Sequence, residues 1–159
     1  GTGNMKFALN GALTVGTYDG ANIEIREAVG ADNFYLFGLR EEQIQEMRKN
    51  NAYNPRACYE NSEYLRRILN AVNSNMFCEK DYVLLFKVIY EELLNRDYYF
   101  LLADLEAFNK ALHDAEKDYT NPQKWAKKAI INVAKIGYFS SDRAVMEYAK
   151  NIWHIKPVD

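Results

Sequence analysis

The order of secondary structure in the first 38 residues is the feature that most limits the fold. Residues 12–17 are a short apolar and β-branched run that ends at the turn signal Tyr18-Asp19-Gly20, and residues 33–38 are a second such run. Between them, residues 21–29 mix apolar and charged side chains and end at Gly30. Two strands joined through a helix pair in parallel with a right-handed crossover. The sequence therefore predicts an α/β fold in which these residues form the edge of an open, Rossmann-like parallel sheet, with the remaining strands upstream.

From residue 39 onward, the spacing of apolar residues predicts a mostly helical region. A proline and several asparagines break the pattern at 50–55, and a last helix is capped by Ser140 or Ser141 and ends near Trp153. Residues 81–95 are apolar on most sides, which predicts a helix buried on more than one face. The other predicted helices are 40–49, 61–72, 101–119 and 122–136.

Three of the predicted helices carry one apolar face each, and we expect these faces to pack against the core. In the helix over 101–119 the apolar residues recur at alternating steps of four and three. Because they span fewer than three heptads, a core-facing helix is favoured over a coiled coil. The three faces consist of Leu101, Leu105, Phe108, Leu112, Ala115 and Tyr119; of Trp125, Ala129, Ile130, Val133 and Ile136; and of Val145, Tyr148, Ala149 and Ile152.

Length and charge limit the classes of function. A chain of 159 residues is most simply one domain, and its net charge of -2 gives no broad basic field, so neither nucleic acid nor an anionic membrane is an expected partner. The sequence has no apolar run of membrane-spanning length and no signal peptide. Its two cysteines, Cys58 and Cys78, lie far apart and without metal-ligand spacing. We interpret them as reduced thiols of a cytoplasmic protein.

The first six residues, Gly1-Thr2-Gly3-Asn4-Met5-Lys6, carry the strongest hint of chemistry. Asn4 is a candidate N-cap for a short helix, and Gly11 is the candidate residue that follows its C-cap. Glycines and a helix start together suit a phosphate group. Lys6 would supply either a counter-charge or a nucleophilic amine. Two plainer interpretations stay open on local chemistry alone: a glycine turn with a solvated lysine, and a cloning remnant that precedes a start at Met5.

Other reactive side chains have plainer interpretations. His113 lies on the polar side of its helix and His154 lies near the chain end, and neither has the neighbours that a metal site requires, so we expect surface histidines and no metal. The serines at 140 and 141 resemble a helix cap rather than a catalytic nucleophile, because no triad spacing accompanies them.

The run from Gly1 to Glu24, GTGNMKFALNGALTVGTYDGANIE, resembles the cofactor-lysine segment of the glycogen, starch and maltodextrin phosphorylases nearly residue for residue. Residues 139–143 and 148–153 also resemble the end of those enzymes. The resemblance implies a C-terminal part of a phosphorylase that begins directly after the family's Glu-Ala-Ser, and it removes the cloning-remnant interpretation. It further implies the C-terminal lobe of a two-lobed glycosyltransferase B-type fold, in which residues 1–38 hold the lysine and 39–159 form the helical region.

The resemblance also implies roles for four residues. Lys6 matches the lysine that carries pyridoxal 5′-phosphate as an internal Schiff base, Thr2 and Gly3 match contacts to the cofactor phosphate, and Gly1 matches a contact to the glucosyl unit. In the family the cofactor phosphate relays a proton to inorganic phosphate, which attacks the terminal α-1,4 bond and releases glucose 1-phosphate. The family is cytoplasmic, homodimeric and allosterically regulated.

The whole active site of such an enzyme would need more than this chain. The α-glucan, the other phosphate ligands and the second lobe are implied upstream of Gly1, so we expect the chain alone to be inactive. An alternative from another class is a helical scaffold or interaction module without bound cofactor. A third, a sugar-nucleotide transferase of the same two-lobed fold, does not explain why the lysine segment is present.

Overall fold

A computed structural model describes residues 2–77 and 85–156. Gly1, Cys78 and the first four residues of the helix predicted over 81–95 lie outside this range. The chain divides into two compact units, one made of Gly1–Phe37 with Lys110–Asp159 and the other of Gly38–Asn109.

The predicted strand-helix-strand order is confirmed in the first unit. The strands β1 (Thr14–Gly16) and β2 (Phe34–Leu36) pair in parallel, with Thr14 opposite Phe34 and Gly16 opposite Leu36. The helix α2 (Ala21–Val29) connects them over the predicted residues. Both strands are shorter than the predicted runs. Among the described residues the sheet has these two strands and the rest of the chain is mostly helical.

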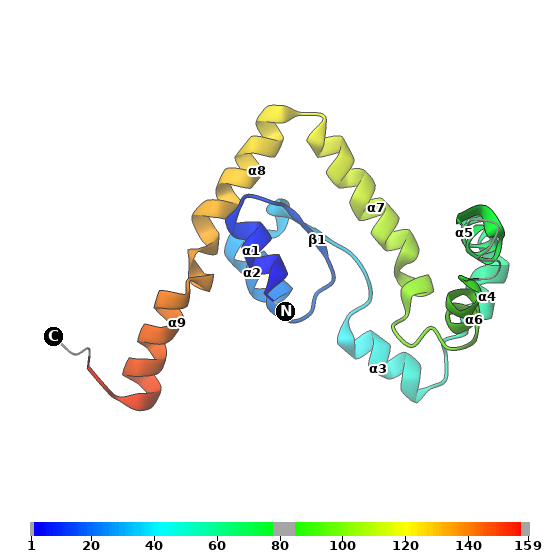
Figure 1. Cartoon of the computed structure of the whole chain (residues 1–159), viewed down its shortest axis with the longest axis horizontal. Helices are drawn as coiled ribbons and strands as arrows, with labels where there is room; N and C mark the ends of the chain where they lie inside the picture. Colours follow the sequence, from blue (N-terminus) through cyan, green and yellow to red (C-terminus); the bar gives the residue numbers. More distant parts are fainter. Residues whose placement is uncertain (1, 78–84, 157–159) are drawn as a thin grey trace. The chain divides into compact units, whose positions relative to one another are not determined.

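The remaining elements of the first unit are mostly helical and are drawn in Figure 1. They are α1 (Gly3–Leu9), the 3-10 turn η1 (Ala31–Asn33), α8 (Pro122–Lys135), the 3-10 turn η3 (Ile136–Phe139), α9 (Ser141–Tyr148) and the π-helical turn η4 (Ala149–Trp153). The helix α7 (Leu101–Tyr119) belongs to both units, since the boundary between them falls at Asn109.

Helices cover both faces of the two-stranded sheet in the first unit. Phe34 is buried with residues of α1, α2 and η3, namely Ala8, Ile25, Val29 and Ile136. The next residue, Tyr35, is buried with Ala111 and Ala115 of α7, and Trp125 of α8 packs against this second cluster. Successive residues of a strand point to opposite faces, so the sheet has α1 and α2 on one side and α7 on the other. The helix α8 contacts both groups, through Trp125 on the α7 side and through its contacts with α1 and α2 on the other. Figure 1 shows α1 and α2 next to each other beside α8.

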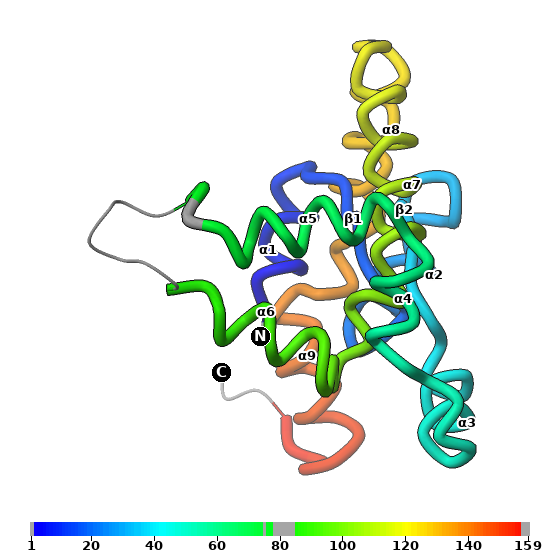
Figure 2. The backbone as a smooth tube through the Cα atoms, turned by 90° about the vertical axis from the view of Figure 1, so that its right-hand side faces the viewer, coloured from blue at the N-terminus to red at the C-terminus, as the bar shows by residue number. Residues whose placement is uncertain are grey.

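The second unit is a group of helices around a leucine cluster. It contains α3 (Glu41–Lys49), α4 (Pro55–Asn61), α5 (Glu63–Asn73), the 3-10 turn η2 (Asn75–Phe77) and α6 (Lys87–Asn95). The buried leucines are Leu65, Leu69, Leu94 and Leu102, which join α5, α6 and the start of α7. Figure 2 shows α5 and α6 next to each other. The sequence did not predict α4, which Asn54 caps and Pro55 begins.

Helix positions were predicted better than helix faces. In α7 the buried apolar residues are Leu102, Ala111 and Ala115, whereas Leu101 and Tyr119 of the predicted face are 54% and 68% exposed. Ala115 belongs to the predicted face and is buried, but beside it the small Ala111, rather than the predicted Leu112, packs in the cluster on this side of the sheet. The face predicted for the last helix is exposed except at Ala149. The face predicted over 122–136 is confirmed at Trp125, Ala129 and Ile136, and the burial predicted over 81–95 is confirmed, among its described residues, at Phe86, Leu93 and Leu94. The exposed apolar residues of these three segments are Leu85, Val88, Ile89, Ile130, Val133, Val145, Tyr148 and Ile152.

Candidate functional site

The short helix α1 carries the candidate lysine and ends in a well-defined cap. The N–H of Gly11 donates to the carbonyl of Ala8 and the N–H of Ala12 donates to the carbonyl of Phe7, each at 3.0 Å. These two bonds form a Schellman motif, in which the residue after the C-cap is left-handed. Gly11 has φ +82° and occupies this position, so the prediction for Gly11 is confirmed.

The start of α1 differs from the sequence prediction. The N-cap is Thr2 rather than Asn4, and the helix begins at Gly3. Asn4 lies inside the first turn, where its Oδ1 accepts a bond of 2.9 Å from the N–H of Met5. An asparagine can satisfy a free N–H from within the first turn as well as from the cap position, which is why the local sequence did not separate the two. The hydroxyl of Thr2 makes no capping hydrogen bond.

Three of the four predicted site residues lie together on the outer face of α1. The N–H of Lys6 donates to the carbonyl of Thr2 at 3.2 Å, so one helical turn brings Thr2, Gly3 and Lys6 together. All three are exposed. Within residues 2–77 and 85–156, the Lys6 ammonium forms no hydrogen bond or ion pair. The fourth residue, Gly1, lies outside the described residues.

The opposite face of α1 fixes the direction in which Lys6 points. Ala8 is fully buried against α2, β2 and η3. Residues two apart on a helix lie about 200° apart around its axis, so burial of Ala8 turns Lys6 away from the core. The lysine is thus presented outward by a helix that is anchored on its other side.

A side-chain amide connects this helix to the sheet. Nδ2 of Asn4 donates to Oδ1 of Asn22 at 2.9 Å, and Nδ2 of Asn22 donates to the carbonyl of Thr17 at 3.1 Å. Thr17 directly follows β1, so these contacts place the start of α1 at the carboxyl end of that strand. In open α/β sheets, ligands bind in the crevice outside the carboxyl ends of the strands. The Lys6 turn lies at the corresponding end of β1.

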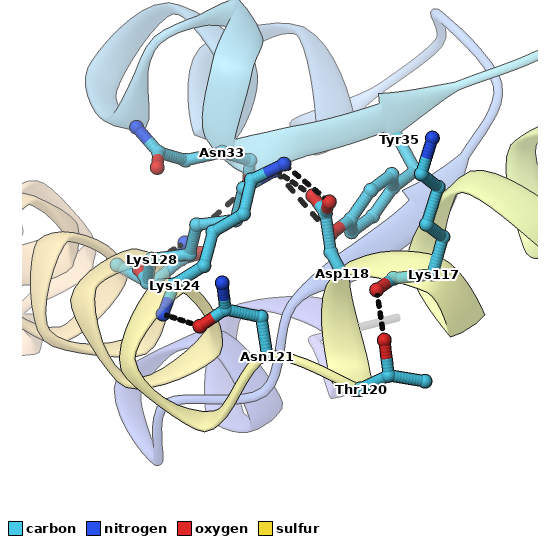
Figure 3. Close-up of polar contacts among 9 residues, drawn as sticks. Asn33, Tyr35, Lys117, Asp118, Thr120, Asn121, Lys124 and Lys128 are labelled. Atoms are coloured by element: carbon cyan, nitrogen blue, oxygen red, sulfur yellow. Dashed lines mark hydrogen bonds and ion pairs between the residues drawn. The ribbon is translucent and has the colours of Figure 1, made fainter.

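A second polar cluster lies on the other face of the sheet and was not predicted. Asp118, at the end of α7, accepts a hydrogen bond of 2.9 Å from Oη of Tyr35 on β2. The ammonium groups of Lys124 and Lys128 also reach its carboxylate from α8, that of Lys128 at 2.7 Å. Figure 3 shows the two lysines and the tyrosine around the carboxylate. Only the spacing of four between the lysines is visible in the sequence, and it does not reveal their partner.

The charges in this cluster are mutually satisfied. Hydrogen bonds from Lys124 and Lys128 hold the pKa of the Asp118 carboxyl well below its usual range. Burial, followed by the hydrogen bond to Asp118, raises the pKa of the Tyr35 phenol. The Asp118 carboxylate on α7 is held by one donor from β2 and two from α8. It thereby fixes these three elements together, and we interpret the cluster as a stabilising contact of the fold.

Both histidines are exposed, and Ser140 and Ser141 lie at the start of α9. His113 lies 3.7 Å from Glu116 on the same exposed helix face, and Nδ1 of His154 lies 3.0 Å from the carbonyl of Lys150. Ser140 occupies the N-cap position of α9 without a side-chain capping bond. In the part of the chain that the structure describes, no His, Cys, Asp and Glu side chains group as a metal site would need, and no helix is long and apolar enough to cross a membrane.

Comparison with known proteins covers nearly the whole chain. Residues 1–155 match the family described as carbohydrate phosphorylase. The chain is 46% identical over 158 residues to glycogen phosphorylase of Synechocystis sp. and 44% identical over 160 residues to glycogen phosphorylase of Bacillus subtilis, with 99% of the chain covered in each case. It is 43% identical over 159 residues, all of the chain, to the brain form of glycogen phosphorylase of Homo sapiens.

These relatives are much longer than the chain. The matched part makes up 18% of the Synechocystis protein, 20% of the Bacillus protein and 19% of the human protein. The chain therefore spans about a fifth of the length of the relatives it matches.

Proposed function

The chain belongs to the carbohydrate phosphorylase family, and we propose that it is the cofactor-lysine part of an α-glucan phosphorylase. Such an enzyme uses inorganic phosphate to cleave terminal α-1,4-glucosidic bonds and releases glucose 1-phosphate. One observation carries the proposal: Lys6 is presented outward at the carboxyl end of β1, on a turn whose other face is buried through Ala8. The names of the relatives support the choice of a glucan as substrate.

The residues of this turn fit pyridoxal 5′-phosphate. The Lys6 side chain, which no described residue engages, would hold the cofactor covalently through its neutral amine. The hydroxyl of Thr2, which makes no capping bond, and the N–H of Gly3 at the first helical position would contact its phosphate. When bound, the cofactor supplies a phosphate group that exchanges a proton with the substrate phosphate. For Gly1, contact with the glucosyl unit stays a prediction.

The rest of the active site is proposed to lie on other parts of the polypeptide. The two-stranded sheet would be the edge of a larger parallel sheet in the C-terminal lobe of a two-lobed glycosyltransferase B-type fold, in a cytoplasmic, homodimeric and allosterically regulated enzyme. Phosphorolysis requires two phosphates and a sugar to be held in place, so all the residues that bind these groups must be present. We therefore propose that the 159-residue chain alone does not catalyse phosphorolysis.

Reductive labelling tests the cofactor site directly. The chain is incubated with pyridoxal phosphate, reduced with borohydride and mapped by peptide mass analysis, with the Lys6→Ala and Lys127→Ala variants in parallel. Lys127 is an exposed lysine of α8 and serves as the control. Stoichiometric labelling of Lys6 that only the Lys6→Ala variant loses supports the proposal. Labelling scattered over many lysines would favour the alternative, a helical scaffold without cofactor.

Activity tests the reaction itself. The full-length protein that carries this chain is assayed for glucose 1-phosphate formed from maltodextrin and phosphate. We expect product from the full-length wild type, none from its Lys6→Ala variant and none from the 159-residue chain. If the isolated chain formed product, the residues on other parts of the polypeptide would not be required for the reaction.

A further inference from the structure

We propose that Asn22 is a positioning residue for the Lys6 turn, holding the first turn of α1 against the carboxyl end of β1. The inference rests on the proposed function and extends it to a residue whose own side chain has no role in the chemistry. Its evidence is a chain of three polar groups, from Asn4 on α1 through Asn22 on α2 to the backbone of Thr17.

The chemistry of the contact requires an amide at position 22. Oδ1 of Asn22 accepts from Asn4 at 2.9 Å, while Nδ2 of the same side chain donates to the Thr17 carbonyl at 3.1 Å. An aspartate could not donate to the carbonyl, and an apolar side chain could do neither. The side chain is part-buried, where a lost partner is harder for water to replace. Asn22 thus connects the side chain of Asn4 to the backbone of Thr17 through one short amide.

The backbone beside Asn22 is shaped to admit this amide. A Cβ on Gly16 would lie 2.8 Å from Nδ2 of Asn22, closer than real side chains approach. Gly16 does not adopt a left-handed φ, so the conformation alone does not require glycine there. The space above β1 that a side chain would occupy is filled by the Asn22 amide instead.

The start of α1 depends on this contact more than its end does. The end is held by the Schellman motif at Gly11 and by the buried Ala8. Thr2 and Gly3 at the start are exposed, and helix ends without side-chain partners fray. Among the described residues, Asn4 is the one of this turn whose side chain forms a hydrogen bond to another element of the unit, namely to Asn22 on α2. Burial of Ala8 sets the side to which Lys6 points, and the amide holds the first turn, with Thr2 and Gly3, in place beside it. Without the amide, we expect this first turn to fray.

Two variants break the contact in different ways in the full-length protein. Asn22→Ala removes the amide, and Gly16→Ala displaces it while leaving its chemistry intact. The control is Asn121→Ala, which removes the amide that caps α8 through the N–H of Lys124 at 3.0 Å and does not touch α1. Apo protein is titrated with pyridoxal phosphate, reduced and mapped for label at Lys6, and hydrogen exchange is measured on the peptide that covers α1.

We expect both variants to lower Lys6 labelling at subsaturating cofactor by about tenfold, because each loses the two hydrogen bonds of the Asn22 amide. We also expect both to raise hydrogen exchange in α1. Gly16→Ala should add nothing in the Asn22→Ala background, and Asn121→Ala should match the wild type in both measurements. Unchanged labelling with raised exchange would show that Asn22 orders the helix without positioning Lys6, and unchanged exchange would also overturn the inference. If the wild type itself does not label at Lys6, the proposed function fails, while exchange still tests whether Asn22 holds the turn.

Discussion

The phenol of Tyr35 donates a hydrogen bond of 2.9 Å to Oδ2 of Asp118, although 83 residues separate the two in the sequence. Tyr35 belongs to β2, and Asp118 is the penultimate residue of α7. The bond therefore connects the sheet to the end of the helix that covers one of its faces. Lys128, whose side chain is 12% exposed, closes the group by pairing with the same carboxylate oxygen at 2.7 Å.

Removal of the Tyr35 hydroxyl should destabilise the first unit less than removal of the carboxylate. Tyr35→Phe loses the buried bond to the Asp118 carboxylate and the longer bond of 3.3 Å that Lys128 donates to the hydroxyl. We expect it to lower the free energy of unfolding by about 1.5 kcal/mol. Asp118→Ala leaves Lys128 without its counter-ion, and we expect a loss of about 3 kcal/mol. Urea denaturation of both variants measures the difference. A larger loss for Tyr35→Phe would show that the ring position, rather than the ion pair, holds the contact.

The Asp118 carboxylate should also make the stability of the fold depend on pH in the acid range. Because the lysines lower the pKa of Asp118 in the folded state, the carboxylate binds protons less readily there than in the unfolded chain, where its pKa is about 3.9. Its contribution is complete above the unfolded pKa and is lost as the pH falls toward the folded pKa. Urea denaturation between neutral pH and pH ~2.5 should show a steeper acid loss for the wild type than for Asp118→Asn. Parallel curves would refute this assignment.

The sequence predicted those features that depend on neighbouring residues. The helix over 21–29 and the left-handed residue at Gly11 are set by local spacing and by glycine, and both were found. The faces of the later helices were predicted only in part: Ala115 and Ile136 are buried, whereas Val145 and Ile152 are exposed. An apolar stripe shows that a face exists and not what covers it. The curated relatives are about five times as long as the chain, so the surfaces that cover apolar residues such as Val145 and Ile152 are proposed to lie on other parts of the polypeptide.

In the candidate site, too, some residues were predicted from the sequence and others were not. Lys6, Thr2 and Gly3 were identified from the segment itself, and the structure shows them on one exposed turn. Asn22 was missed because its role depends on folding, which brings together residues 18 positions apart in one contact and five apart in the other. Asp118 was missed for the same reason, at a much larger separation.

Gly11→Ala should weaken the anchored end of the Lys6 helix. At φ +82° a Cβ is strained whatever space surrounds it, and the nearest atoms, Val133 Cγ2 at 3.5 Å and Ala129 Cβ at 3.8 Å, leave ordinary contact distance. The cost is therefore conformational, about 1 kcal/mol. Thermal unfolding measures it, with Gly3→Ala as the control because no atom lies within 4 Å of its added Cβ and its φ is not positive. Equal losses in the two variants would show that the Schellman cap contributes little.

Asn132 is fully buried on α8, and its amide is only partly bonded. Nδ2 donates to the carbonyls of Lys128 at 3.1 Å and Asn33 at 3.4 Å, while Oδ1 has no hydrogen-bond partner among the described residues. A buried acceptor without a partner costs free energy that offsets the two bonds. The Asn132 amide therefore contributes little to the free energy of unfolding.

Asn132→Leu should consequently be tolerated. The side chains are similar in size, so we expect the free energy of unfolding to change by less than about 1 kcal/mol. Asn132→Ala, which leaves a cavity, should cost about 2 kcal/mol, and Ile136→Ala, at an equally buried apolar position, about 3 kcal/mol. Urea denaturation of the three variants tests this order. A loss from Asn132→Leu as large as that from Ile136→Ala would show that Oδ1 is satisfied, and an ordered water bound by the amide would be the partner to seek.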